Sequence, residues 1–352
     1  MILHIGNFST FIPSFVQFIN KNFNDKRHLF CFLGYKENYR VVEQDNLKIS
    51  KPSLAGTIKH YFLVLKNIHH AEKVILHGLF DVRLILLFSL MPWVLKKCYW
   101  IIWGGDLYFH QKPKLRTRDK IKEALRAFVI KRLGYLVTYI PGDLALARKW
   151  YNAKGEHKEC LMYLSNIFED KFSNKNYHPR KSVGEDINII IGNSADPTNN
   201  HIEIFEKLVP YKSKKIHIIA PLSYGDKKYA ERVISYGRQE FGGKFKPIID
   251  FIPLDDYQQV LKSVDIAVFN HKRQQAMGNT ITLLGMGKIV YLRADVTQWT
   301  LFKSLGIAVK DISEFDLYPQ LNEDDLAHNA RIVKSYFNYA NLVTQYRRIF
   351  SE

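Results

Sequence analysis

Cysteine is scarce in this sequence, and its spacing excludes two kinds of cysteine chemistry. The three cysteines, Cys31, Cys98 and Cys160, are far apart and lie in apolar runs. Such a pattern indicates neither a disulfide framework nor a zinc site, because both need a set of suitably spaced cysteines. We therefore expect buried free thiols in a reducing cytoplasm.

The sequence also lacks a long hydrophobic run and a secretion signal. The most apolar segment, residues 84–95, has 12 residues and contains a proline, so it is too short to span a bilayer. The chain starts with MILHIG, which has the pattern of a buried strand, and no basic region or cleavage site stands before it. We expect a cytoplasmic protein with no transmembrane helix.

Motifs of several enzyme classes are missing. No GxGxxG follows residue 5 or residue 191, which argues against a dinucleotide-dependent dehydrogenase, and no GxxxxGK[ST] is present, which argues against a P-loop NTPase. HExxH and GxSxG are absent as well. The chain has no DxD motif, so we expect neither a metal nor a cofactor.

The chain does contain enough apolar sequence for two α/β domains. Its 352 residues are 47% hydrophobic, and this length exceeds one typical core. Short apolar runs alternate with helical patterns, which indicates parallel sheets. The expected strands are residues 2–5, 29–33, 74–76, 99–103 and 136–140 in the first half, and 187–191, 216–220, 247–251, 266–269 and 288–292 in the second.

A polar segment at residues 165–186 separates the two series of strands. We interpret it as a linker between a domain at residues 1–164 and a domain at residues 187–322. Residues 323–352 have the pattern of one long amphipathic helix that returns to the first domain. The predicted fold is two Rossmann-like open parallel-sheet domains facing a cleft, in which ligands bind beyond the carboxyl ends of the strands.

The segment 265–293 predicts a phosphate site in the second domain. It has the pattern of a buried strand, a polar loop, a short helix and another strand. Glycine before a helix start exposes unpaired N–H groups at the positive end of the helix dipole, which suits a diphosphate. We predict that the diphosphate of a donor substrate binds here, and the predicted donor-binding residues are Asn270, Arg273, Gln274, Gln275, Gly278, Asn279 and Thr280. The alternative is an ordinary connection with Asn279 as the helix N-cap.

Two other strand ends of the second domain carry side chains that can hydrogen bond to a ligand. Gly192, Asn193 and Ser194 follow one strand, and Tyr224 follows the next. Glycine permits close approach of the backbone to a ligand, and the polar side chains supply hydrogen bonds. We assign these four residues to the same donor site, although a capped turn is the alternative.

The first domain offers candidate acceptor residues at its strand ends. Asp106 follows a buried strand behind two glycines, and we predict that it aligns or deprotonates an acceptor hydroxyl, with His77 as the second catalytic candidate. A helix N-cap at Asp106 and a structural histidine at His77 are the alternatives. The predicted acceptor-binding residues are Gly6, Asn7, Trp103, Gly105 and Tyr108.

Positive charge is concentrated in the first half. Residues 1–165 contain 26 Lys and Arg against 12 Asp and Glu, a balance of +14, out of +17 for the whole chain. A basic amphipathic helix is expected over residues 116–133, and such a helix binds anionic lipid headgroups. The predicted membrane contacts are Arg116, Arg118, Lys120 and Lys122. A solvated helix that covers the core is the alternative.

Five sequence blocks resemble the family of bacterial 4-acetamido-4,6-dideoxygalactose (Fuc4NAc) transferases. They are HGLFD from residue 77, WGGDLY from residue 103, PGDL from residue 141, IGNSADPTNNH from residue 191 and FNHKRQQAMGNTITLLGMGKIVYL from residue 269. The chain departs from the family pattern in WGGD, where WGAD is expected, and in Ala276-Met277-Gly278, where the family tends to Gly-Ile-Gly. A glycine-tyrosine pair expected after Pro221 is also missing.

The resemblance implies a glycosyltransferase of the GT-B type from enterobacterial common antigen synthesis. Its donor would be a dTDP-linked amino-deoxy sugar, bound by the second domain, and its acceptor an undecaprenyl diphosphate-type lipid-linked saccharide. The enzyme would sit on the inner face of the cytoplasmic membrane and bind no nucleic acid. The charge of the first half leaves a polyanion-binding protein as an alternative, and the two-domain pattern leaves a nucleotide-sugar epimerase.

Overall fold

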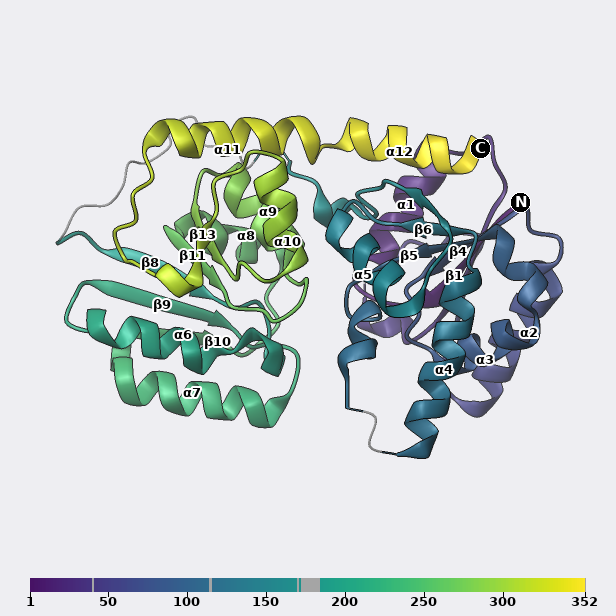
Figure 1. Ribbon diagram of the computed structural model, residues 1–352, viewed down its shortest axis with the longest axis horizontal. Coiled ribbons are helices and arrows are strands. Elements are labelled where there is room, and N and C mark those ends of the chain that lie inside the picture. Colours follow the sequence, from purple (N-terminus) through teal and green to yellow (C-terminus); the bar gives the residue numbers. More distant parts are fainter. Residues whose placement is uncertain (40, 114–115, 170, 172–183, 352) are drawn as a thin grey trace. The chain divides into compact units, whose positions relative to one another are not determined.

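The chain forms two compact units, each built on a parallel β-sheet (Figure 1). The computed structural model describes residues 1–39, 41–113, 116–169, 171 and 184–351. One unit contains Met1–Ser165 together with Tyr339–Glu352, and the other contains Asn166–Asn338. Most of the predicted linker at residues 165–186 lies outside the described residues.

The first unit has a seven-stranded sheet in the order β3-β2-β1-β4-β5-β6-β7. Its strands are β1 (Ile2–Asn7), β2 (His28–Leu33), β3 (Leu47–Ser50), β4 (Lys73–His77), β5 (Cys98–Ile101), β6 (Tyr135–Val137) and β7 (Glu156–Lys158). Every neighbouring pair is parallel. The order reverses at β1, which lies between β2 and β4, and ligands of open parallel sheets bind at such a switch point.

Helices cover both faces of this sheet. They are α1 (Ile12–Asn22), α2 (Leu54–Ile68), α3 (Val82–Leu90), α4 (Thr117–Arg132), α5 (Pro141–Tyr151) and α12 (Tyr339–Ser351). On one face α1 packs against α12 through aromatic contacts such as Phe18 with Tyr339 and Tyr346, while α2, α3 and α4 lie on the other face (Figure 1). The buried core between sheet and helices includes Leu76, Phe88 and Trp100.

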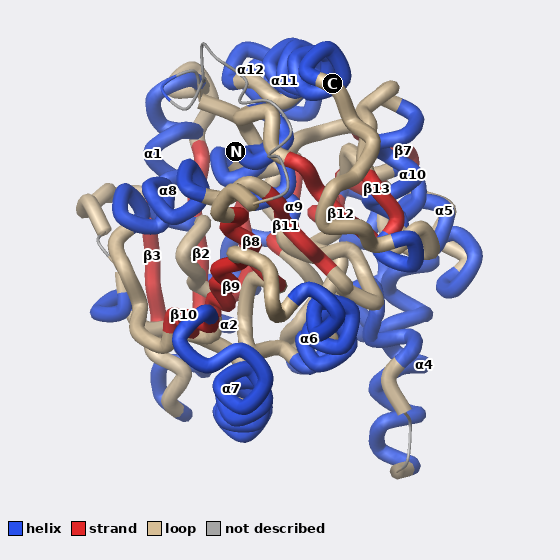
Figure 2. Tube along the Cα trace, turned by 90° about the vertical axis from the view of Figure 1, so that its left-hand side faces the viewer, coloured by secondary structure: helices blue, strands red, loops and turns tan. Residues whose placement is uncertain are grey.

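The second unit has a six-stranded parallel sheet in the order β10-β9-β8-β11-β12-β13. Its strands are β8 (Ile187–Ile191), β9 (Ile216–Pro221), β10 (Phe245–Ile248), β11 (Ile266–Phe269), β12 (Ile289–Leu292) and β13 (Lys310–Asp311). Its helices are α6 (His201–Leu208), α7 (Lys227–Phe241), α8 (Leu254–Ser263), α9 (Met277–Gly285), α10 (Thr297–Ser304) and α11 (Glu323–Tyr336). The order reverses at β8, between β9 and β11, so their carboxyl ends form the switch point (Figure 2).

The prediction of one long C-terminal helix is wrong. The structure has two helices, α11 in the second unit and α12 in the first. The chain leaves helical geometry at Phe337, which has φ −91° and ψ 61° and is fully buried. The Nδ2 group of Asn338 donates to the carbonyl oxygens of Lys334 and Ser335, so the last turn of α11 is closed by a side chain.

Candidate active site

Polar side chains from three strand ends meet in the second unit. Gln275, after β11, donates from Nε2 to Asn193 Oδ1 at 3.0 Å and to Ser194 Oγ at 3.4 Å. Its Oε1 accepts a hydrogen bond from Thr198 Oγ1 at 3.0 Å. Asn193 donates to the hydroxyl of Tyr224, after β9, at 3.0 Å. The structure therefore brings together four of the predicted donor residues, because their strands are neighbours.

An ion pair joins the loop after β11 to the loop after β8. Nη2 of Arg273 lies 3.2 Å from Asp196 Oδ2, and its Nη1 donates to the carbonyl of Gln274. Burial raises the pKa of Asp196, but hydrogen bonds from Thr198 and the charge of Arg273 outweigh burial and lower that pKa. The Arg273 side chain is 21% exposed, so the guanidinium has donors left for an anionic ligand. Sequence reasoning missed Asp196 as a partner of this arginine.

Helix α9 starts at Met277, before the glycine that was predicted to precede the helix. Its N-cap is Ala276, in the left-handed region at φ 57°, and no side chain caps the helix. Gly278, Asn279 and Thr280 thus lie inside the first turn. The alternative role of Asn279 as N-cap is also wrong, because its Nδ2 donates to the Tyr257 hydroxyl at 2.8 Å. A strained, uncapped helix start leaves N–H groups available to an anion.

Three buried side-chain nitrogen atoms of the second unit have no hydrogen-bond partner in the described part of the chain. They are Asn270 Nδ2, His271 Nδ1 and Gln298 Nε2. Burial lowers the pKa of His271 to about 3, so its imidazole is neutral. Of the predicted donor residues, Asn270 and Gln274 are buried.

Gly192 is required by the close packing of its loop. It has φ +60°, and a Cβ atom there would lie 2.3 Å from His201 Nε2 and 2.7 Å from Asn199 Oδ1. Asn199 is the centre of the loop, since its Oδ1 accepts hydrogen bonds from the backbone of Asn193 and contacts His271 Nε2 at 2.8 Å. The glycine therefore allows the loop to fold onto its own support, and no direct ligand contact is needed to explain it.

Asp106 in the first unit has a structural role. It is fully buried, and its Oδ2 accepts hydrogen bonds from the Leu79 backbone and Trp100 Nε1, at 2.9 and 2.7 Å. Its Oδ1 accepts from the backbones of Trp103 and Leu107, both at 3.0 Å. With four donors in place, no lone pair faces an acceptor hydroxyl. The predicted catalytic base is therefore reassigned as the group that fixes the loops after β4 and β5, and the N-cap alternative holds.

His77 belongs to a chain of buried rings. Its Nδ1 lies 2.6 Å from the Tyr163 hydroxyl, and its Nε2 lies 3.2 Å from His4 Nδ1. His4 Nε2 is hydrogen bonded to His28 Nδ1 at 3.0 Å, and Trp103 Nε1 donates to Tyr163. Burial lowers the pKa of His77 to about 3. The imidazole is neutral and fully engaged, which favours the structural alternative over a base that receives a substrate proton.

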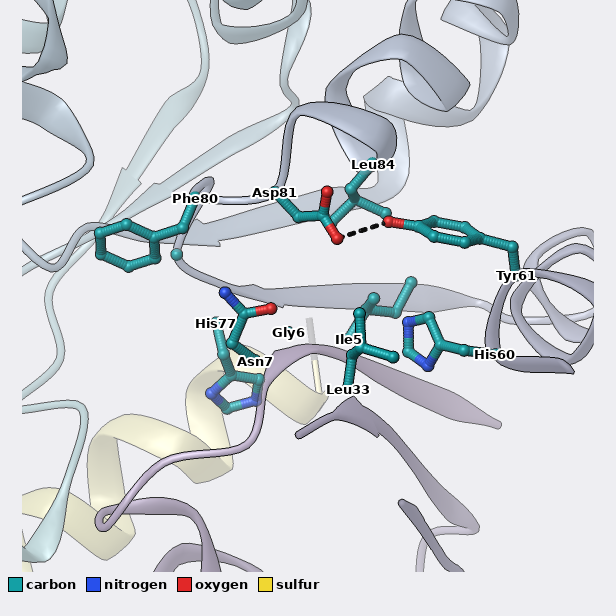
Figure 3. A pocket seen from close by; sticks show the side chains of 11 residues that line it. Ile5, Gly6, Asn7, Leu33, His60, Tyr61, His77, Phe80, Asp81 and Leu84 are labelled. Carbon is teal, nitrogen blue, oxygen red and sulfur yellow. Dashed lines mark hydrogen bonds between the residues drawn. The ribbon is translucent and has the colours of Figure 1, made fainter. Parts of the chain in front are cut away.

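A narrow pocket lies beside His77 at the switch point of the first unit (Figure 3). It has room for about one water molecule, at roughly 10 Å³. Gly6 and Asn7 line it, as do Tyr61 and Asp81, whose side chains are hydrogen bonded at 2.8 Å. Asp81 was missed as a site residue, although it closes the HGLFD block and follows β4.

The remaining predicted acceptor residues divide into two groups. Trp103 and Gly105 are partly exposed beyond β5. Tyr108 is a core residue, 9% exposed and packed edge-on against Trp150, so its assignment to acceptor binding is wrong. Gly6 is needed where β1 passes close to β4, because a Cβ atom there would lie 2.8 Å from His77 Cβ.

Comparison with known families agrees with this arrangement. The model of a family described as 4-alpha-L-fucosyltransferase, glycosyl transferase group 56, matches residues 3–309. The chain belongs to this family. It is therefore a glycosyltransferase, and the two alternatives, a polyanion-binding protein and an epimerase, are not supported.

Solved glycosyltransferases of the GT-B type share the fold. A structure of HepE from Anabaena, in complex with UDP and glucose, aligns with a TM-score of 0.70 at 11% identity over 100% of this chain and 99% of that one. WaaG, a glycosyltransferase of lipopolysaccharide biosynthesis, aligns with a TM-score of 0.58 at 11% identity over 99% and 98%. At this identity the likeness shows the fold, and this fucosyltransferase family member has the GT-B architecture of two parallel-sheet domains.

The four predicted membrane contacts are exposed at the start of α4. Arg116 is the N-cap, and Arg118, Lys120 and Lys122 occupy the first two turns. This end of the helix extends away from the sheet (Figures 1 and 2). Arg126, further along, is instead buried, where it donates to the Leu79 carbonyl and pairs with Glu123 at 3.4 Å. None of the described helices has both the length and the apolarity needed to cross a bilayer.

Proposed function

We propose that this glycosyltransferase moves an amino-deoxy sugar of the Fuc4NAc type from a dTDP-sugar to a lipid-linked saccharide. The observation that carries the proposal is the convergence of Arg273, the uncapped start of α9 and the loop after β8 at one switch point. A guanidinium and a helix N-terminus together neutralise a diphosphate leaving group without a metal. The HepE structure, which holds UDP, supports a nucleotide sugar as the donor class.

Arg273→Ala tests the donor site directly. We expect dTDP binding to weaken by about 1.5 to 3 kcal/mol, or roughly 10-fold to 100-fold, the range for hydrogen bonds to a charged group. Titration calorimetry with dTDP measures the effect. Lys272→Ala is the matched control, because it removes the same charge from an exposed neighbouring side chain. Equal affinity of the Arg273 variant and the parent for dTDP would show that the diphosphate does not bind at this loop.

The nucleotide base is tested by ligand-induced stabilisation. A ligand that binds only the native state raises the unfolding midpoint in proportion to the logarithm of its concentration over Kd. We expect dTDP to shift the midpoint more than UDP or GDP at equal concentration. A larger shift with UDP would be consistent with a glycosyltransferase but would contradict dTDP as the nucleotide of the donor.

For the acceptor we propose a lipid-linked saccharide of the undecaprenyl diphosphate type at the cytoplasmic face of the membrane. The basic start of α4 supports this proposal. Four cationic side chains at the positive end of a helix dipole destabilise the helix, so their placement is best explained by an anionic surface outside the protein. The strand ends beside the narrow pocket near His77, at Asn7 and Asp81, are the proposed place for the acceptor sugar, which would lie outside the pocket because the pocket has room for about one water molecule.

Removing these charges should weaken lipid binding. We expect the variant with Arg116, Arg118, Lys120 and Lys122 replaced by Gln to lose about 1 kcal/mol for each charge close to the surface, and the parent's binding to fall with salt. Flotation with anionic vesicles measures both effects. A control with four exposed cations of the second unit replaced by Gln, Lys214, Lys215, Lys227 and Lys228, has the same net charge. If both variants float equally, the α4 contact is refuted.

A further inference from the structure

The outer face of α2 is apolar. Leu54, Ile58, Phe62 and Leu65 recur at helical spacing and are 81%, 62%, 68% and 39% exposed. A surface helix normally turns charged residues to solvent and apolar residues to the core. Here the inner face is also apolar, with Val64 buried. The exposed stripe therefore needs an explanation other than packing within the unit.

The apolar surface continues beyond α2. The hydroxyl of Tyr61 on α2 donates to Asp81, the N-cap of α3, so the two helices are neighbours at this point. On α3, Leu86 and Leu90 are 48% and 68% exposed, and Trp93 just after it is 63% exposed. We call the seven residues of α2, α3 and Trp93 the α2–α3 face. Several large exposed apolar side chains on neighbouring helices are typical of an interaction site.

The charges around this face are basic except for Asp81, the N-cap of α3, which is 14% exposed and pairs with Arg83 at 3.1 Å. Neither α2 nor α3 contains an acidic residue, and Lys59 and Lys66 are exposed next to the apolar stripe. On α3, Arg83 is exposed at the start of the same helix face. An exposed tryptophan with flanking lysines is the composition of a protein surface at the boundary between headgroups and acyl chains.

A second copy of the chain fits this face poorly. In a twofold dimer the same patch meets itself. Lys59 and Lys66 would then approach their own copies, and Asp81, the carboxylate at the start of α3, is already paired with Arg83. Like charges brought together across an interface are costly. An anionic bilayer offers both an apolar interior and negative headgroups, so it matches both parts of the surface.

We infer that the α2–α3 face inserts its apolar side chains into the surface of an anionic lipid bilayer. This mode differs from the attraction of α4, because partition of apolar groups persists in salt whereas attraction between exposed charges is screened. The functional reason for this insertion rests on the proposed lipid-linked acceptor, whereas the insertion itself is argued from the surface alone. It places α2, which also lines the narrow pocket beside His77 through Tyr61, against the membrane that would hold that acceptor.

Vesicle sedimentation at high salt tests the insertion with the full chain and no substrate. We expect the parent to retain binding to vesicles of mixed neutral and anionic phospholipid. The double variant Ile58→Ser/Phe62→Ser should bind about 30-fold more weakly, which corresponds to about 2 kcal/mol. Phe251→Ser is the matched control, because Phe251 is 84% exposed in the second unit, and it should bind as the parent does. Equal binding of the double variant and the parent overturns the proposal.

Trp93 supplies a second readout. Its fluorescence, taken as the difference between the parent and Trp93→Phe, should be quenched by vesicles with brominated acyl chains. Absence of quenching while the protein sediments would show that the face stays outside the bilayer. Sedimentation velocity identifies the competing occupant, since a parent dimer that the double variant dissociates would assign the face to a second copy. Calorimetry with dTDP reports the donor site separately, so failure of insertion and failure of the proposed reaction are distinguishable.

Discussion

Asp106→Asn should destabilise the first unit by about 3 to 5 kcal/mol, the range for removing one partner of a buried charged network. The amide oxygen of Asn can replace only one carboxylate oxygen. Its NH₂ group would then face two N–H groups that donate to the carboxylate in the parent, such as those of Leu79 and Trp100. Arg126, whose charge acts on Asp106, would keep Glu123 as its ion-pair partner at 3.4 Å, so the main loss is in the hydrogen bonds.

Urea unfolding of the parent and the variant measures this effect. Asp45→Asn is the control, because Asp45 is exposed in a turn of the same unit, and surface substitutions change stability by about 0.5 kcal/mol or less. Turnover should fall together with stability. A variant that keeps its unfolding midpoint and loses turnover by about 100-fold or more would return Asp106 to the role of general base.

The cluster of polar side chains after β11 and β8 could be predicted from the sequence because its signals are local. Arg273, Gln275 and the helix that follows stand within a few residues of one another, and parallel pairing of β11 with β8 brings Asn193 to them. The pairing of Arg273 with Asp196 could not be predicted. It depends on how far two loops extend beyond their strands, which no periodicity records.

Asp106 and His77 show the limit of reasoning from strand ends. Their positions after β5 and β4 were predicted, and the edge of the sheet is where ligands bind. What decides their role is the set of partners of each polar atom. The donors to Asp106 come from Leu79, Trp100, Trp103 and Leu107, and three of these four are backbone groups whose direction a sequence does not specify.

Short edge strands were the main omission in the fold. β3, β7 and β13 lie at sheet edges, and β7 and β13 consist of the residues EHK and KD. A strand exposed on one side needs no apolar run, so it leaves little hydrophobic signal. The break between α11 and α12 was missed for the opposite reason, because the apolar spacing continues through Phe337 although the two helices pack on different cores.

We also expect the first unit to lose stability in mild acid. His4, His28 and His77 are buried in one hydrogen-bonded chain, and burial is the largest cause that lowers the pKa of each, to about 4 for His28 and about 3 for His77. In the unfolded chain their pKa is about 6.5. The unfolded state therefore binds protons more tightly than the native state, and stability falls as the pH drops below about 6.5.

The size of the effect can be tested with one substitution. Between about pH 7 and about pH 5, His28 and His77 should each contribute a loss of roughly 2 kcal/mol, which is a large part of the stability of a domain, and His4 acts in the same direction. His28→Asn keeps a group that can hydrogen bond to His4 Nε2 but does not titrate. Its unfolding midpoint should therefore change less with pH than that of the parent. Urea unfolding followed across this pH range gives both slopes, and identical slopes would mean that the histidine chain does not govern the acid response.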